Sequence, residues 1–358
     1  MKNNVSRWLF LAFMLTGAAA LSGCWDIKDI NHRSLPIVMG VKETAGTYQV
    51  LLLIPDASPS QTNVKIISQT GSTINEILDQ IDKNMENKVD LLHLKVILFE
   101  RSVAEKGLSQ SIESFMRSRD ISNKTLTAIS EGALEPLFEK LKSSSSNGGM
   151  EIYDFFEKNA GWSPEVVQTR IWEVFRSMNS FTRDVVIPTI KPGHTTTIES
   201  TGAAMIKNGK MVGVIDSEET LLYNLFKGAG TQGKIEVMHR ATVKIVADRL
   251  TRSSVMREGS AMMIGRLHLK VTVLETVGDP TVAEIKKEID EQLSTRLQAM
   301  LRTAQSKEAD ILGLGQLYRD KLSRENLRQW RSKYYPFMKI EFKVHVIVQD
   351  GGLLKIKS

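Results

Sequence analysis

The residues best suited to covalent chemistry stand near the start of the chain. Cys24 is the only cysteine among 358 residues, and it directly follows Leu21-Ser22-Gly23. Small residues before a cysteine, at the end of an apolar run, are typical of a lipoprotein signal. In such a signal the leader is cut after Gly23, and the Cys24 sulfur takes a diacylglyceryl group. Because the chemistry needs a thiolate, no other residue type can replace the cysteine.

The leader has the composition of an export signal. It carries Lys2 and Arg7, has no acidic residue, and contains an apolar run from Trp8 to Ala20. That run is shorter than the ~20 residues needed to cross a bilayer. We therefore expect residues 1–23 to be removed and two or more acyl chains to hold Cys24 on the outer face of a membrane. The alternative is an ordinary cleaved signal with Cys24 as a buried or stray thiol.

Polar and aromatic residues follow the cysteine at once. They are Trp25, Asp26, Asp29 and Asn31. One interpretation is that they only cap and pack the first strand. The other is that they form a docking surface for a partner close to the membrane.

A glycine-rich segment imitates a phosphate-binding loop. Gly228–Lys234 fits the first seven positions of that motif, but Ile235 stands where Ser or Thr should bind magnesium. The order of elements is also reversed, because a helix is predicted before the segment and a strand after it. We therefore predict an interdomain turn and no nucleotide binding.

No catalytic or metal-binding constellation is evident. His268 and His345 fall on the polar sides of two strands that could be neighbours. A metal site needs three or four ligands, and no cysteine or carboxylate cluster completes one here. No Gly-x-Ser-x-Gly elbow and no acid/base pair of carboxylates appears. The sequence thus predicts no enzyme activity, no cofactor and no metal.

The charge distribution argues against nucleic-acid binding. The net charge is +6, and basic residues alternate with acidic ones, as in Arg252, Arg257 and Glu258. A nucleic-acid surface would need a clustered basic stripe with aromatic residues for stacking. A mildly basic surface is better suited to a neighbouring anionic membrane.

The length of the mature chain predicts two or three domains. In the first, residues 24–142, strand-like runs at 35–41 and 48–54 frame a turn and predict a hairpin. Thr73 and Glu76 form a capping-box pattern before an amphipathic helix. Further strands (94–99 and 126–129) alternate with helices up to about Leu141.

A serine-rich segment, Ser143–Gly149, predicts a linker to a middle domain, residues 150–230. Ser163-Pro164 predicts the start of a helix that runs to Met178. Strand-like pieces follow at 185–190, 196–206 and 210–215, and Asn208-Gly209 predicts a hairpin between the last two. Asp216 and Glu219 form a second capping box, and Gly228 ends that helix.

The last part, residues 234–358, shows the most regular pattern. Apolar and polar residues alternate over 235–247, 267–273 and 339–348, which is typical of antiparallel sheets with one covered face. A long helix starting at Asp279-Pro280 carries an apolar stripe that can cover that face. We therefore predict a mixed α+β fold of three domains, in which the C-terminal domain packs an antiparallel-rich sheet against a long helix.

Short segments spread over nearly the whole mature chain carry a family resemblance. They are Cys24–Asn31, Ile37–Gly40, Gly202–Lys207, Met211–Gly213, Glu218–Thr220, Ala309–Gly315 and Trp330–Val348. On these segments the chain resembles the C-subunit lipoproteins of spore germination receptors, the Ger(x)C family. The end, Gln349–Gly352, departs from the more basic tail of that family.

The resemblance implies a three-domain protein without enzyme activity, anchored on the outer face of the spore inner membrane. There it would join two integral membrane subunits in a nutrient-sensing germinant receptor. The germinant pocket of that family is credited to a membrane subunit, so no ligand contact is assigned to this chain. A solute-binding lipoprotein of a transporter is the alternative, although the predicted antiparallel hairpins speak against its two-lobed architecture.

Overall fold

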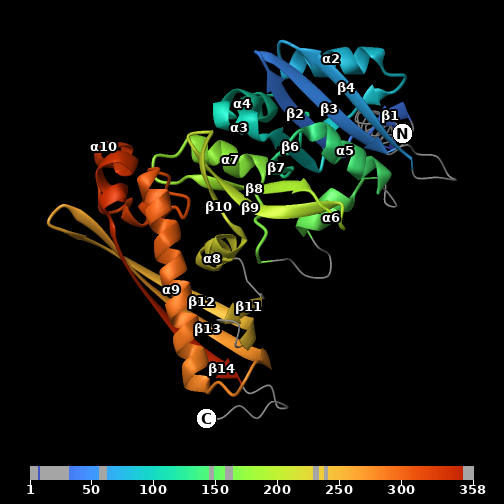
Figure 1. Ribbon diagram of the computed structural model, residues 1–358. Coiled ribbons are helices and arrows are strands. Elements are labelled where there is room, and N and C mark those ends of the chain that lie inside the picture. The colour runs from blue at the N-terminus through green and yellow to red at the C-terminus, as the bar shows by residue number, and fades with distance from the viewer. Residues whose placement is uncertain are drawn as a thin grey trace. The chain divides into compact units, whose positions relative to one another are not determined.

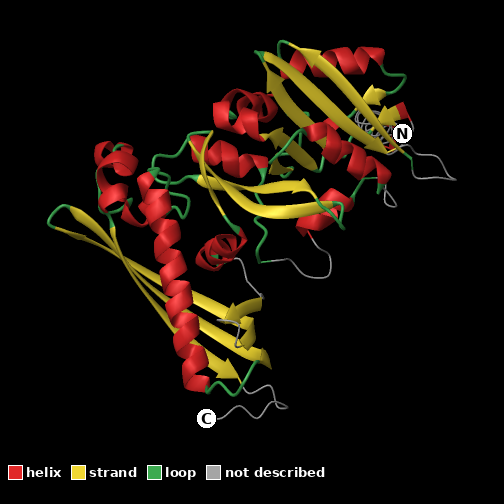
Figure 2. Cartoon of the chain, viewed as in Figure 1, coloured by secondary structure: helices red, strands yellow, loops and turns green. Residues whose placement is uncertain are grey.

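The structure is a computed structural model, drawn in Figures 1 and 2. It describes residues 7–8, 32–55, 63–144, 149–157, 164–228, 234–237 and 241–349. The chain divides into a short N-terminal unit, residues 1–33, and a second unit, residues 34–358.

The first two thirds of this unit alternate strands and helices. The strands are β1 (Arg33–Ser34), β2 (Val38–Thr44), β3 (Thr47–Pro55), β4 (Val64–Gly71), β5 (Lys88–Val89), β6 (Val96–Glu100), β7 (Leu126–Ser130), β8 (Val185–Pro192), β9 (Ile198–Lys207) and β10 (Lys210–Ile215). The helices are α2 (Ile74–Asn84), α3 (Arg101–Lys106), α4 (Ser109–Ser118), α5 (Leu134–Ser143), α6 (Glu151–Glu157), α7 (Ile171–Met178), α8 (Ser217–Lys227) and the short 3-10 helix η3 (Leu91–His93).

Eight of these strands form one sheet, in the order β10-β9-β8-β7-β6-β2-β3-β4. The four central strands, β8, β7, β6 and β2, are parallel to their neighbours in this group. Antiparallel strands extend the sheet at both edges, with β9 and β10 on one side and β3 and β4 on the other.

The central strands are apolar on both faces, as parallel strands covered on both sides must be. Every residue of β7 is buried, and so are the first four of β6. One face packs a core against α2, α3, α4 and α7, and the other packs a separate core against α5 and α6. Figure 1 shows helices on both sides of this sheet.

The sheet continues across the serine-rich segment. Strand β7 precedes that segment and β8 follows it, yet the two pair directly, at Ile129 with Thr189 and Ser130 with Ile190. The predicted boundary between residues 142 and 150 therefore falls within one continuous sheet. Pairing of strands distant in sequence leaves no local pattern, so the linker composition alone did not reveal it.

The helix predicted from Ser163-Pro164 begins later than expected. Ser163 lies outside the described residues, Pro164 lies in a turn, and α7 starts only at Ile171. Residues 164–166 form a turn and a bend, and residues 167–169 stay outside any helix because tertiary hydrogen bonds hold Thr169. Its carbonyl accepts from the Thr127 N–H at 2.8 Å, and its hydroxyl donates to the Val186 carbonyl at 2.6 Å.

The predicted turns and caps are confirmed where local chemistry dictates them. Asn208 and Gly209 both adopt positive φ, +50° and +78°, at the turn between β9 and β10. Asp216 accepts the backbone N–H of Glu219 at 2.8 Å, and the Glu219 carboxylate accepts that of Asp216 at 3.1 Å. Gly228 ends α8 with φ +67°.

The last third forms a second, four-stranded sheet in the order β11-β12-β13-β14. Its strands are β11 (Lys234–Val237), β12 (Ala241–Arg257), β13 (Ser260–Thr276) and β14 (Lys339–Gln349). The helical segments between β13 and β14 are α9 (Val282–Ser306), the 3-10 helix η4 (Leu314–Tyr318), α10 (Arg324–Arg328), the π-helix η5 (Trp330–Tyr334) and the 3-10 helix η6 (Tyr335–Phe337).

This sheet is antiparallel at β11, β12 and β13, but β14 runs parallel to β13. The alternation over 339–348 predicts an antiparallel strand, and that detail is wrong. The long helical connection after β13 carries the chain back to the start of the sheet, so β14 runs in the same direction. Alternation reports a covered face and does not report strand direction.

Helix α9 covers one face of the second sheet, as Figure 2 shows. Its predicted stripe is buried, and it packs with the inward residues of β12 and β13. The stripe consists of Ile285, Ile289, Leu293, Leu297, Met300 and Leu301. Each such side chain contributes roughly 1.5–3 kcal/mol on burial. The mixed α+β fold, with a long helix on an antiparallel-rich C-terminal sheet, is thus confirmed.

Within the described residues, no helix combines the length and apolar character needed to cross a membrane.

Candidate functional site

A buried ion pair joins the loop before β8 to helix η5. The Asp184 side chain is fully buried, and Arg331 donates two hydrogen bonds to it. Arg331 Nε donates to Oδ2 at 2.9 Å and Nη2 donates to Oδ1 at 2.7 Å. Nη2 also donates to the carbonyls of Ser180 and Arg183, at 2.7 and 3.1 Å. This bidentate geometry is the strongest form of a side-chain ion pair.

A second buried carboxylate, Asp310, lies beside this pair. Its oxygens accept the N–H groups of Leu314 at 2.8 Å and Gly315 at 2.7 Å, and Trp330 Nε1 at 2.9 Å. Burial, followed by the nearby Asp184 charge, raises the pKa of Asp310 to about 6, although these three donors favour the anion.

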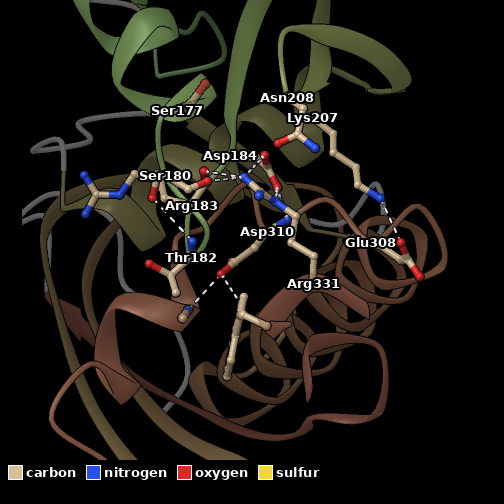
Figure 3. Close-up of polar contacts among 12 residues, drawn as sticks. Ser177, Ser180, Thr182, Arg183, Asp184, Lys207, Asn208, Glu308, Asp310 and Arg331 are labelled. Atoms are coloured by element: carbon tan, nitrogen blue, oxygen red, sulfur yellow. Dashed lines mark hydrogen bonds and ion pairs between the residues drawn. The ribbon is translucent and has the colours of Figure 1, made fainter. Parts of the chain in front are cut away.

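The two aspartates are also linked through their backbones. The Asp310 N–H donates to Asp184 Oδ2 at 2.8 Å, and the Asp184 N–H donates to the Asp310 carbonyl at 2.8 Å. We call Asp184, Asp310, Trp330 and Arg331 the polar junction. Figure 3 shows Arg331 facing Asp184, with Asp310 close by.

Two glycines allow the chain to wrap around Asp310. Gly313 has φ +67°, a left-handed conformation that glycine adopts without strain. Gly315 lies against the indole of Trp330, so that a Cβ there would stand 2.6 Å from Nε1 and 2.8 Å from Thr182 Cβ. These glycines let two backbone N–H groups turn toward one carboxylate.

Aromatic side chains enclose the polar junction. Trp330 packs against Tyr318, Tyr334 and Tyr335, with ring centroids 5.0, 6.2 and 6.3 Å away. The Tyr318 hydroxyl donates to the carbonyl of Met262 in β13 at 2.6 Å. The apolar cover removes water from the charges, so each hydrogen bond inside it counts for more.

Peripheral contacts extend the junction on both sides. Lys207, at the end of β9, forms an ion pair with Glu308 at 2.8 Å (Figure 3). The Gln316 side-chain amide donates to the Thr182 hydroxyl. The junction therefore fastens residues 180–184 and the end of β9 to the segment 308–331. Because both buried carboxylates are saturated with donors, neither is poised as a general base or as a nucleophile.

The residues predicted as sites at the N-terminus all fall outside the described residues. These are Gly23, Cys24, Trp25, Asp26, Asp29 and Asn31. Lipidation, cleavage after Gly23 and membrane-proximal docking therefore stay predictions. Most of the glycine-rich segment, residues 229–233, also lies outside them, but α8 precedes it and β11 follows it, as predicted.

The two histidines do come together. His268 and His345 pair across β13 and β14, with ring centroids 5.1 Å apart and an interplanar angle of 20°. Across the described ranges, no group of three or more His, Cys, Asp or Glu side chains is placed to hold a metal ion. The arrangement is a stacked pair at the polar face of the sheet.

The polar junction was not predicted from the sequence, although a signal was available. Asp310 is flanked by the apolar residues Ala309 and Ile311, and Asp184 directly precedes an apolar strand. An acid within an apolar run is usually paired when buried. The partner Arg331, 147 residues from Asp184, has no local signature.

Comparison with known proteins gives a consistent result along the chain. Residues 26–192 match a family described as "Spore germination protein N-terminal domain", and residues 201–352 match one described as "Spore germination B3/ GerAC like, C-terminal".

Individual relatives match either nearly the whole chain or part of it. "Spore germination protein GerQC" of Bacillus cereus is 21% identical over 350 residues, with 92% of this chain and 94% of the relative covered. "Spore germination protein B3" of Bacillus subtilis (strain 168) is 30% identical over 145 residues, or 38% of this chain and 37% of the relative. Among solved structures, the GerBC protein matches with a TM-score of 0.56 at 15% identity, covering 86% of this chain and 96% of that one.

Proposed function

The chain belongs to the Ger(x)C family of spore germination proteins, and we propose that it is the lipid-anchored, non-enzymatic subunit of a nutrient germinant receptor. The observation that carries the proposal is the match to both family domains, over residues 26–192 and 201–352. In this proposal the chain docks on integral membrane subunits at the outer face of the spore inner membrane.

The proposal of a lipid anchor is supported by the sequence Leu21-Ser22-Gly23-Cys24, with its lone cysteine. A diacylated N-terminus would hold the folded unit at the bilayer without a spanning helix. Tethering also raises the effective concentration of the chain near its membrane partners, so weak contacts suffice for assembly.

A non-enzymatic role agrees with the chemistry of the polar junction. Asp184 and Asp310 are the buried acids of the described part of the chain. The carboxylate oxygens of both accept hydrogen bonds from donors that hold the fold. Such a junction supports a rigid docking body rather than a turnover site. A solute-binding lipoprotein is not favoured, because the family match points to a receptor subunit.

The anchor is tested by replacing Cys24 with Ala in sporulating cells fed an alkyne-tagged fatty acid. The variant should lose the label, leave the membrane fraction and respond weakly to nutrient. Ser22→Ala is the matched control, since a small residue still precedes Gly23, and it should stay labelled. Native protein found in the aqueous fraction with a free Cys24 thiol would contradict the anchor.

Docking is tested by solubilising the membranes in mild detergent and identifying the proteins that co-purify with the chain. Integral membrane subunits of a germinant receptor should be recovered. Trp25→Ala together with Asp26→Ala should keep the lipid label but reduce this recovery if these residues dock. Unchanged recovery would show instead that they only pack the first strand. Recovery of no integral membrane protein by the native chain would overturn the docking role.

A further inference from the structure

An open cleft of about 690 Å³ lies beside the polar junction. One wall is the end of α7 with the loop that follows it, and the other is the segment from η4 to α10. The residues that line the cleft include four arginines and three apolar side chains. They are Arg176, Arg183, Arg319, Arg324, Phe181, Leu322 and Leu327. We call this the arginine cleft.

The arginine cleft has no acidic lining residue within the part of the chain that the structure describes. Arg176 lies 3.7 Å from Glu173 and over the ring of Trp172, and neither of these two residues lines the cleft. Arg319 donates to Gln316 at 3.5 Å, a long hydrogen bond to a neutral group. Four arginines thus line one space, and one of them, Arg176, has an ion-pair partner in Glu173.

Arg183 lines the cleft and is half-buried. Burial, followed by the neighbouring Arg176, lowers its pKa, while Asp310 acts in the opposite direction. The buried Nε atoms of Arg183 and Arg176 have no hydrogen-bond partner among the described residues. A partly buried guanidinium with a buried, unbonded Nε, such as that of Arg183, is costly in the free protein. A bound anion would remove that cost.

We propose that the arginine cleft binds a phosphate-bearing ligand. A phosphate monoester carries close to two negative charges near neutral pH and offers three acceptor oxygens. Arginines on both walls can pair with such a phosphate. A carboxylate ligand would suit them less well, because it offers only one charge and two oxygens. The proposal is independent of the receptor role argued above.

The apolar side chains that line the cleft favour an amphiphilic ligand. Phe181 has 44% of its surface exposed, with Arg328 over its ring at 5.9 Å, and Leu322 and Leu327 line the same space. The cleft volume lies within the range of small-molecule sites. A soluble phosphate ester and the phosphate of a lipid headgroup share this chemistry, and experiment can separate the two sources.

The test uses the full lipidated chain in nanodiscs of phosphatidylcholine. Glycerol 3-phosphate is titrated by isothermal calorimetry, with glycerol as the uncharged control. The native chain should bind the ester and not glycerol. In the double variant Arg183→Gln, Arg319→Gln the Kd should rise at least about tenfold, the loss expected for charge-assisted hydrogen bonds. Equal binding by the double variant, or no binding by the native chain, overturns the proposal.

Matched variants separate binding from folding. Arg302→Gln, on the exposed face of α9, removes one charge away from the cleft and should keep the native Kd. Arg319→Lys keeps the charge but loses the planar fork, so its affinity should fall between native and Arg319→Gln. Each variant must also show a cooperative thermal transition. A Kd that rises equally in Arg302→Gln would reduce the effect to net charge and overturn the site.

The source of the phosphate is identified by repeating the titration in nanodiscs containing phosphatidylglycerol. If a lipid headgroup occupies the cleft, the apparent affinity for glycerol 3-phosphate should fall in these discs for the native chain but not for the double variant. If the affinity is the same in both kinds of disc, the ligand is a soluble phosphate ester.

Discussion

The polar junction and the arginine cleft lie side by side in the fold and treat the same residue type in opposite ways. The Arg331 guanidinium donates hydrogen bonds to Asp184 and to two backbone carbonyls. Arg183, one residue before Asp184, has no ion pair or side-chain hydrogen bond among the described residues. One arginine is fully used in holding the fold, and the other is left available.

This contrast separates structural charges from functional ones. A buried charge that is paired on every side fixes one arrangement of the segments that carry it, and removing its partner is expensive. Like charges gathered in an open cleft lower the stability of the folded state instead. Proteins keep such destabilising residues where they serve to bind a ligand. Substitutions in each region should therefore change stability by different amounts.

The largest effect is expected from Asp184→Ala. The change leaves the Arg331 guanidinium buried without its carboxylate, which typically costs about 3–5 kcal/mol. Urea unfolding followed by tryptophan fluorescence would measure the loss, and Trp330 within the junction is a local reporter. Asp320→Ala, an exposed acid, is the control and should change little. A cost below 1 kcal/mol would mean that the junction is not a structural lock.

A smaller effect is expected from Gly315→Ala. The new Cβ would stand 2.6 Å from Trp330 Nε1 and 2.8 Å from Thr182 Cβ, so the indole must move away from Asp310. Overpacking of this kind costs roughly 1–3 kcal/mol. The free energy of unfolding should fall by that amount, whereas Gly132→Ala, with open space around its Cβ, should be nearly neutral. Equal stability of the two variants would argue against tight packing at the junction.

The pH dependence of stability tests the buried charge of Asp310 itself. The folded chain keeps the Asp310 proton up to about pH 6, while the unfolded chain releases it near 3.8. Between these values the folded state binds more protons, so this group's contribution to the free energy of unfolding falls as the pH rises. The slope is at most about 1.4 kcal/mol per pH unit.

Asp310→Asn removes this titration and serves as the reference. The stability of the native chain relative to Asp310→Asn should decrease from pH 4 to pH 6 and then level off. Parallel pH profiles for the two proteins would show that Asp310 does not titrate in this window. Denaturation curves at a series of pH values give the comparison directly.

Much of the fold was predictable because its signals are local. The turn at Asn208-Gly209, the capping box at Asp216 and Glu219, and the stripe of α9 all depend on residues within a few positions of one another. Each is a matter of backbone conformation or of periodicity. The structure confirms all of them.

The order of the strands and the polar junction depend on contacts between distant segments. The apolar neighbours of Asp310 indicate a buried acid, but no local pattern identifies its partners. Asp184 and Asp310 are 126 residues apart, and neither residue alone specifies the other. The segment before α7 shows the same limit, because the hydrogen bonds of Thr169 to β7 and β8 override a good local helix start. Tertiary hydrogen bonds outweigh propensities of a few tenths of a kcal/mol.

The smallest effect on stability is expected within the arginine cleft. Arg324→Gln removes one of four like charges from an exposed position that has no acidic partner in the cleft lining. The free energy of unfolding without ligand should stay within about 0.5 kcal/mol of native, as for most surface changes, and any shift should be stabilising. A loss above 1 kcal/mol would show that Arg324 is held structurally, like Arg331. A protein that keeps its stability without Arg324, yet loses about 3–5 kcal/mol when the Asp184–Arg331 pair is broken, uses its arginines for two separate purposes.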